Sequence, residues 1–194
     1  GQRTVLQLPQ LSIEKGEIYG LLGPNGAGKT TTISILSSLT KQDSGEVTLN
    51  GYDLNKDSKK IKRIIGVVPQ EIALYQELSA YDNLIFWGSL YNIPSTQLKE
   101  KANQSLKLLG LHERKDDKIK TYSGGMKRRI NIASALLHSP EIIFMDEPTV
   151  GIDPQSRNLI YEVIEKLNKQ GITIIYTTHY MEEAERLCKR IGII

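Results

Sequence analysis

The sequence predicts an α/β fold with a mixed, mainly parallel β-sheet core, an antiparallel β flank and an inserted helical subdomain. Nearly continuous apolar runs, typical of strands buried on both faces of a parallel sheet, predict the core; they are residues 18–22, 64–68, 142–145 and 172–176. Stretches with helical periodicity connect these runs. The long stretch between Gln70 and Ile142 has helical periodicity but no strand-like run, which predicts the inserted subdomain.

The antiparallel flank is predicted near the start of the chain. Residues 4–13 show short apolar alternation, and residues 46–49 form another short strand pattern. Asn50-Gly51 follows the second pattern and is a strong turn sequence for a hairpin. We therefore expect short antiparallel strands beside the parallel sheet.

A glycine-rich loop lies between the first apolar run and a helix expected over residues 29–39. Its glycines let backbone N–H groups point into one concavity, and the helix start adds partial positive charge. We expect it to bind phosphate, with Lys29 on the terminal phosphates and the Thr30 hydroxyl on Mg²⁺. The alternative is a flexible turn, which the place between a strand and a helix disfavours. The nucleotide contacts expected here come from Gly23, Asn25, Gly26, Ala27, Gly28, Lys29, Thr30 and Thr31.

The composition is that of one soluble globular domain. The chain has 194 residues, of which 39% are hydrophobic and 24% charged. The net charge of +3 is too small to indicate nucleic acid as a bulk partner. No apolar run approaches the ~18 residues that span a bilayer, and no basic-then-apolar leader is found. The single Cys188 excludes an internal disulfide and fits a reducing cytosol.

The inserted helical arm is expected over about residues 76–135. Aromatic side chains concentrate in its first part, at Tyr81, Phe86, Trp87 and Tyr91. Such a projecting insertion is a natural place to dock a partner. The alternative is that these side chains form the arm's own small core.

Two adjacent carboxylates end the third apolar run, where strands of an open α/β sheet deliver ligand groups. Neighbouring strand residues face opposite ways, so Asp146 and Glu147 must have different roles. We expect Asp146 to bind Mg²⁺ through water, and Glu147 to polarise the water that attacks the γ-phosphate. The alternative is a solvated acid pair at a strand end.

A second candidate anion site begins at Ser123, a good helix N-cap followed by Gly124 and Gly125. It is either a capped helix with a flexible start, or a helix that faces a phosphate bound by a second copy of the chain. The basic residues 127–129 follow on the same helix. Without interleaved aromatics, they favour a solvated helix face or a dimer edge over nucleic-acid binding.

Asp153-Pro154 predicts the start of another helix, because aspartate is a good N-cap and proline fits the first turn. Gly171 is a plausible terminator. One apolar face is expected from Leu159, Ile160, Val163, Ile164 and Leu167.

Six spaced motifs make the chain resemble the nucleotide-binding domain of an ABC transporter over essentially its whole length. They occur in the family's order: Walker A at 23–31, the Q-loop at Gln70, the signature at 122–126, Walker B at 142–148, the D-loop at 149–154 and the H-loop at 178–179. The resemblance implies a P-loop NTPase fold, with a RecA-like core and β flank from residues 1–75 and 136–194. The helical arm, ending in the signature helix, completes this single domain.

The resemblance also implies roles for residues outside the phosphate loop. Gln70 would complete the Mg²⁺ shell, although a polar strand terminus is the plain alternative. Ser123, Gly124 and Gly125 would contact the γ-phosphate held by an opposite subunit. Asp153 would couple the two sites, and His179 would hold the γ-phosphate in line with the catalytic carboxylate.

The chain departs from the common family pattern in the signature, which has Tyr122 and Met126 where leucine and glutamine are usual. This form of the signature resembles that of bacterial exporters of drugs, polysaccharides or ions. The family's adenine-stacking aromatic is expected upstream of Gly1, since residues 1–18 contain no aromatic. The last residues, 191–194, form the start of a strand pattern, so we expect a domain trimmed at both ends.

The implied function is that of an ATP-binding and ATP-hydrolysing transporter subunit. Two copies would close head to tail on ATP and Mg²⁺, and transmembrane permease subunits would be the other partners. The chain would lie in the cytoplasm at the inner face of the membrane. The alternatives are a soluble ABC-type ATPase acting on ribosomes or chromosomes, and a nucleotide-binding regulator.

Overall fold

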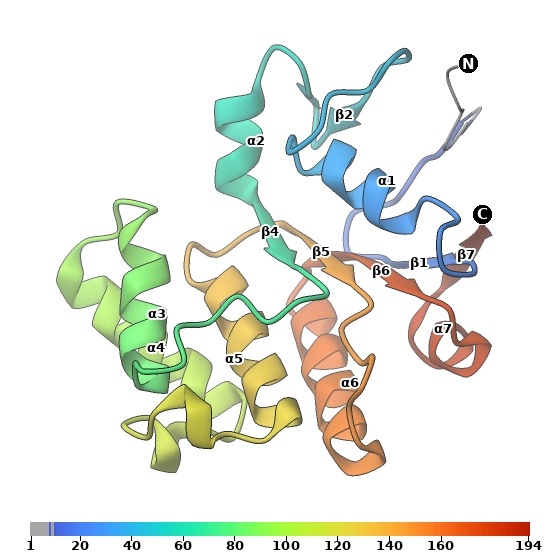
Figure 1. The fold of residues 1–194 in the computed structure, drawn as a ribbon. Coiled ribbons are helices and arrows are strands. Elements are labelled where there is room, and N and C mark those ends of the chain that lie inside the picture. The colour runs from blue at the N-terminus through green and yellow to red at the C-terminus, as the bar shows by residue number, and fades with distance from the viewer. Residues whose placement is uncertain (1–7, 9) are drawn as a thin grey trace.

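The computed structural model describes residue 8 and residues 10–194. Its main sheet has the strand order β4-β5-β6-β1-β7, and every neighbouring pair is parallel (Figure 1). The strands are β1 (Ile18–Leu22), β4 (Ile65–Val68), β5 (Ile142–Asp146), β6 (Thr173–Thr178) and β7 (Arg190–Ile193). The predicted α/β fold with a mainly parallel sheet is therefore confirmed.

The antiparallel flank consists of a short hairpin, β2 (Thr48–Leu49) and β3 (Tyr52–Asp53). Asn50 and Gly51 form its turn with φ angles of 51° and 81°, as a two-residue hairpin loop with positive φ at both positions requires. The expected strand over residues 46–49 is thus shorter than predicted. Of the other expected strand, residues 4–7 and 9 lie outside the described residues, and residues 10–13 form no strand.

Helices cover both faces of the main sheet (Figure 1). The helices α1 (Lys29–Leu36) and α2 (Ser58–Ile64) lie on one face, while α5 (Gly124–Leu136) and α6 (Pro154–Lys169) lie on the other. The short helix α7 (Met181–Leu187) follows β6 and contacts β1. The helix α1 ends three residues before the expected Leu39, because Ser38 turns the chain with a φ of 58°.

The stretch between β4 and β5 is helical, as the sequence predicts. It holds α3 (Ala80–Ser89), α4 (Ser95–Leu108), the 3₁₀ turns His112–Arg114 and Ile119–Thr121, and then α5. Of the aromatic residues of this stretch, some belong to the core and others are exposed, so they fit both alternatives given above. Tyr81 and Trp87 pack against the buried core, whereas Phe86 and Tyr91 are 37% and 41% exposed.

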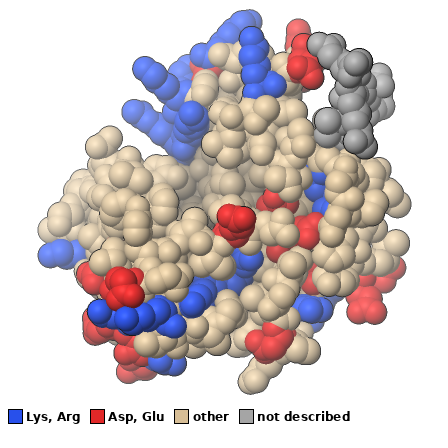
Figure 2. All heavy atoms as spheres, viewed as in Figure 1, with Lys and Arg blue, Asp and Glu red and all other residues tan. Residues whose placement is uncertain are grey.

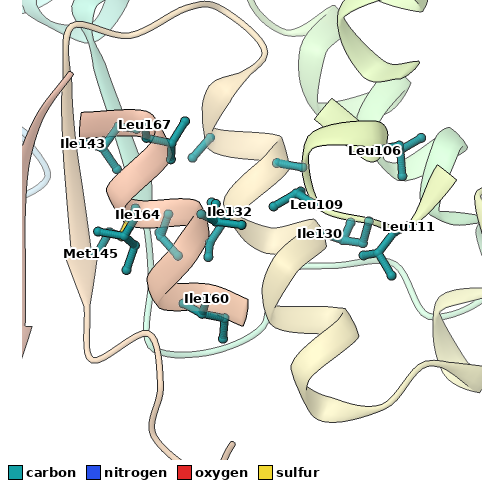
Figure 3. Close-up of a cluster of buried hydrophobic side chains, with 14 of the residues drawn as sticks. Leu106, Leu109, Leu111, Ile130, Ile132, Ile143, Met145, Ile160, Ile164 and Leu167 are labelled. Atoms are coloured by element: carbon teal, nitrogen blue, oxygen red, sulfur yellow. The ribbon is translucent and has the colours of Figure 1, made fainter. Parts of the chain in front are cut away.

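Two hydrophobic cores lie on opposite faces of the sheet. Ile143 and Met145 enter the core beneath α5 and α6, while Phe144 between them enters the core beneath α1 and α2. This alternation explains why the strand sequences are continuously apolar. Figure 3 shows the first core, where side chains of β5 and α6 pack with Ile132 of α5 and the layer extends to Leu106, Leu109 and Leu111.

The apolar face of α6 differs from the prediction at one position. Leu159 is 37% exposed, whereas Ile160, Val163, Ile164 and Leu167 are buried as expected, so the inclusion of Leu159 was wrong. Tyr161 is buried in its place, at 5% exposure. Its hydroxyl donates a hydrogen bond to a buried carboxylate on α7, which satisfies the polar end of the ring.

Charged side chains are scattered over the surface, with one group of basic residues over α2 (Figure 2). Acidic partners accompany part of this group, since Lys60 Nζ lies 2.8 Å from Asp57 Oδ1. Within residues 8 and 10–194, none of the helices combines the length and apolar character needed to cross a membrane.

We expect Gly66→Ala to destabilise the fold markedly, because a Cβ on β4 would lie 2.5 Å from the Ala135 carbonyl oxygen of α5. Backbone must then shift, and overpacking of this kind costs about 2–3 kcal/mol. Gly88→Ala is the comparison, since its Cβ would meet the end of the Leu98 side chain, which can rotate. Chemical denaturation should rank Gly66→Ala as clearly less stable, and equal losses would contradict the expectation.

Candidate functional site

The site lies at the carboxyl edge of the main sheet. The strand β6 lies between β5 and β1, so the loops that follow these three strands meet there. Beside them is a pocket of about 250 Å³. Its lining residues are Asn25, Gly26, Gly28, Lys29, Thr30, Thr31, Gln70 and Glu147. Most residues expected to contact nucleotide therefore share one cavity with Gln70.

The glycine-rich loop leaves β1 and folds over the start of α1. Its first amide, that of Gly23, donates to the Thr178 carbonyl oxygen at 3.3 Å and ties the loop to β6. Gly26 and Gly28 have φ angles of 83° and 104°, which residues with a side chain rarely adopt. The loop thus depends on glycine at these two positions, and the N-terminus of α1 faces the pocket.

Lys29 and Glu147 form a buried ion pair beside this loop, with Nζ and Oε1 2.9 Å apart. Lys29 is 4% and Glu147 5% exposed. Lys29 Nζ also donates to the carbonyl oxygens of Gly23 at 2.7 Å and Pro24 at 2.9 Å. An ammonium group has three donors, so protein groups use all of them here.

His179 extends this ion pair into a chain of three side chains. Its Nδ1 lies 3.0 Å from Glu147 Oε2, and it follows β6 directly. Glu147 has a φ of 44°, a left-handed conformation that is uncommon for a residue with a side chain and is typical of functional sites. The strained turn directs Glu147 away from the path of β5 and toward both partners.

Asp146 and Glu147 have separate partners, as the sequence predicts for adjacent residues at a strand end. Asp146 is the last residue of β5, is 4% exposed and accepts a hydrogen bond from Thr177 Oγ1 at 2.7 Å. The same hydroxyl accepts from the Glu147 amide at 3.0 Å. Thr177 thus connects the two acids, a role for which its own sequence position gives no indication.

The signature residues lie apart from this pocket within the chain. Ser123 caps α5 by accepting from the Met126 amide at 3.2 Å, and Ser123 and Gly124 are exposed. Gly125 is buried, and a Cβ there would lie 2.3 Å from Ser156 of α6. The N-termini of α5 and α6 are therefore in close contact.

Asp153 caps α6 as predicted and accepts from the Ser156 amide at 2.9 Å. Hydrogen bonds from Ser156 hold the pKa of the Asp153 carboxyl below its ordinary value. Asp153 therefore stays charged at the positive end of the helix.

The interpretation of residues 127–129 as a solvated helix face or dimer edge was wrong for Arg128. This residue is 3% exposed, and its guanidinium donates to the carbonyl oxygens of Pro69 at 2.7 Å and of Gln70. Asn131, one turn further along α5, accepts from the Ala73 amide at 3.3 Å. Burial lowers the pKa of the Arg128 guanidinium, but arginine does not lose its proton in proteins, so the group stays charged.

These contacts connect the signature helix directly to the segment that carries Gln70. We expect Arg128→Met to lower the free energy of unfolding by about 2–4 kcal/mol, because the carbonyl oxygens of Pro69 and Gln70 lose the buried guanidinium that donates to them. We also expect it to loosen residues 69–73, which amide hydrogen exchange would measure. Lys127→Met, on the same helix, is the matched control; equal exchange of residues 69–73 in both variants would contradict the expectation.

Comparison with known proteins assigns the chain to a family. The family model for ABC transporters matches residues 6–150. The chain is 57% identical over 194 residues to the linearmycin resistance ATP-binding protein LnrL of Bacillus subtilis, covering 100% of this chain and 62% of that protein. It is 41% identical over 194 residues to the Nod factor export ATP-binding protein I of Cupriavidus metallidurans, covering 100% of this chain and 64% of that protein. It thus spans less than two thirds of the length of these relatives.

Among solved structures, the chain is similar to the ATP-binding cassette MJ0796, solved as a dimer in a post-hydrolysis state bound to ADP and Pi. The TM-score is 0.83 at 30% sequence identity, over 95% of this chain and 83% of that one. Together, the fold, the order of the motifs and the family match confirm the predicted resemblance. The chain belongs to the ABC transporter family of ATP-binding proteins.

Proposed function

We propose that this chain binds and hydrolyses ATP. The observation that carries the proposal is the chain of side chains Lys29, Glu147 and His179 beside a glycine-rich loop at a helix N-terminus, in which Lys29 and Glu147 are buried and His179 is partly exposed. It combines a cation for phosphate, a carboxylate for water and a histidine that orients that carboxylate. Family membership and the similarity to a structure bound to ADP and Pi support the same reaction.

In this proposal, the loop amides of residues 25–31 and the ammonium of Lys29 bind the β- and γ-phosphates. Glu147 accepts a proton from the attacking water, and His179 holds both the carboxylate and the γ-phosphate. Water attacks in line, so the rate comes from positioning and charge, without a covalent intermediate.

Mg²⁺ fits the residues that the structure brings to the pocket. Thr30 and Gln70 both line it and carry oxygen donors, and one oxygen of the nearby Asp146 is held by Thr177. Mg²⁺ takes few protein ligands and completes its shell with water and phosphate oxygens, which suits such a sparse set. We propose that Thr30, Gln70 and Asp146 hold it, where it would neutralise charge on the β- and γ-phosphates.

The complete site is proposed to need a second copy of the chain. Ser123, Gly124 and Gly125 lie outside the pocket of their own chain, although an exposed helix N-terminus suits an anion. Head-to-tail pairing would bring these residues over the γ-phosphate bound by the other copy. The proposed division, with a core of residues 1–75 and 136–194 and an arm of about 76–135, would place the phosphate loop and the signature in different parts.

The relatives' names support a role in export. One relative is named for linearmycin resistance and the other for Nod factor export, and both are called ATP-binding proteins. We propose that the chain energises export through separate transmembrane permease subunits, at the cytoplasmic face of the membrane. The exposed Phe86 and Tyr91 of the arm offer apolar surface for that contact.

Phosphate release from ATP and Mg²⁺ tests the proposed activity. Because the signature must come from another copy, we expect the rate to rise more than linearly with protein concentration. The expected species is a monomer that binds ATP but hydrolyses it poorly, as followed by light scattering alongside the assay. Strictly proportional activity from a demonstrated monomer would contradict the shared site, and no release at any concentration would contradict hydrolysis.

A further inference from the structure

The carboxylate of Glu183 lies buried on α7, beside the candidate site but outside its pocket. Glu183 is 3% exposed and accepts hydrogen bonds from four hydroxyl groups. Thr149 Oγ1 at 2.7 Å and Tyr161 OH at 2.9 Å donate to Oε1. Tyr176 OH at 2.9 Å and Thr178 Oγ1 at 2.8 Å donate to Oε2. A carboxylate has about four acceptor sites, so these hydroxyls occupy its full capacity.

Such an arrangement is costly if its only purpose is packing. A buried carboxylate loses its hydration and needs hydrogen bonds to compensate, whereas apolar side chains of similar volume fill a core without that cost. Burial raises the pKa of the Tyr176 hydroxyl well above its ordinary value, and burial together with Glu183 raises that of Tyr161. Both phenols therefore stay protonated and remain donors.

Two of the four hydroxyls lie close in sequence to the proposed catalytic groups, one in the loop after β5 and one at the end of β6. Thr149 is two residues beyond Glu147, and Thr178 directly precedes His179. Thr178 Oγ1 also accepts from the Tyr180 amide at 3.0 Å, so it fixes the backbone on both sides of His179. One carboxylate thus connects two loops whose side chains meet at 3.0 Å, between Glu147 Oε2 and His179 Nδ1.

We infer that Glu183 is a positioning residue for ATP hydrolysis, which holds the loops of Glu147 and His179 at the separation that their contact requires. The inference rests on the proposed hydrolysis. Glu183 does not line the pocket, so it acts through the two loops.

Glu183→Gln tests this directly, because the new amide group replaces an acceptor oxygen and faces two hydroxyl donors. We expect kcat to fall on the order of tenfold to a hundredfold, as small misplacements of catalytic groups do. We expect ATP affinity, measured with a fluorescent nucleotide, to stay within about twofold, since the phosphate loop keeps its contacts. If Glu183→Gln fails to fold, Thr178→Val is the second variant, because it removes the hydrogen bond from Thr178 to Glu183 with a side chain of equal size.

Thr173→Val is the matched control at the other end of β6. Thr173 is 6% exposed, and its hydroxyl also accepts a backbone hydrogen bond, from the Gly16 amide at 2.9 Å. We expect this variant to lose stability but to keep kcat. An equal fall of kcat in Thr173→Val and Thr178→Val would overturn the inference, because it would show a general effect of weakening the strand.

A His179→Ala background separates positioning from plain stabilisation. If Glu183 acts through His179, Glu183→Gln should add little to the loss already caused by His179→Ala in single-turnover measurements. A fully multiplicative further loss would overturn the inference. Wild-type kcat in Glu183→Gln would overturn it alone, whereas absence of turnover in the unmodified chain would overturn the proposed function as well.

Discussion

Replacement of Glu147 by glutamine is expected to abolish ATP turnover while preserving ATP binding. The amide oxygen keeps a partner for Lys29, whose Nζ lies 2.9 Å from Oε1, but an amide cannot accept the proton of the attacking water. Loss of a general base lowers a rate by about a thousandfold. We expect the variant to accumulate as a closed dimer with ATP, which size-exclusion chromatography with and without nucleotide would measure.

Glu141→Gln is the matched control for this prediction. Glu141 precedes the same strand, β5, at its other end, where it is exposed and lies 3.5 Å from Lys15 Nζ. Its replacement should leave both turnover and assembly unchanged. Near wild-type hydrolysis by Glu147→Gln would show that the proposed base is wrong.

Lys29→Met is expected to weaken ATP binding by about tenfold to a hundredfold, which corresponds to the 1.5–3 kcal/mol of charge-assisted hydrogen bonds. The methionine keeps the apolar stem of the side chain but removes its charge. It also leaves the buried Glu147 without its cation, so thermal unfolding should begin at lower temperature. Equilibrium titration with nucleotide measures the affinity.

Lys15→Met is the control, because it removes an ion pair at the surface, between Lys15 and Glu141, by the same substitution. Lys15 and Glu141 have side chains that are 74% and 44% exposed, so little binding or stability should be lost. Unchanged affinity in Lys29→Met would contradict a phosphate contact by Lys29.

Local pattern predicted much of the fold and of the pocket. The buried strands are continuously apolar because successive side chains enter two different cores, as at Phe144 and Met145. Lys29 and Glu147 could be predicted because Lys29 begins the helix after the glycine-rich loop and Glu147 directly follows a buried strand, and both positions belong to motifs with their own chemistry. Their direct contact, however, was not predicted, since the roles assigned to them involve phosphate and water.

The sequence did not predict the contacts of single polar residues whose partners lie far away along the chain. Thr177 bonds Asp146 across 31 positions of sequence, and Arg128 reaches Pro69 across 59. Nothing in the sequence around such a residue distinguishes a buried donor from a solvated one, so the sequence wrongly predicts a surface position for Arg128. Leu159 was misplaced for a related reason: the helix period alone does not reveal that a hydrogen bond to Glu183 draws Tyr161 into the core.

The close packing of Gly66 against Ala135 holds the C-terminal end of α5 against β4. The helix has 13 residues; its last turn rests on β4, and Ser123 caps its other end, which packs against the start of α6. With a rise of 1.5 Å per residue it is about 20 Å long, so a tilt of about 10° at Ala135 moves Ser123 by about 3 Å. That displacement equals the length of a hydrogen bond, so under the proposed function a small tilt of α5, with the start of α6 that it contacts, would decide whether Ser123 reaches a phosphate bound by another copy.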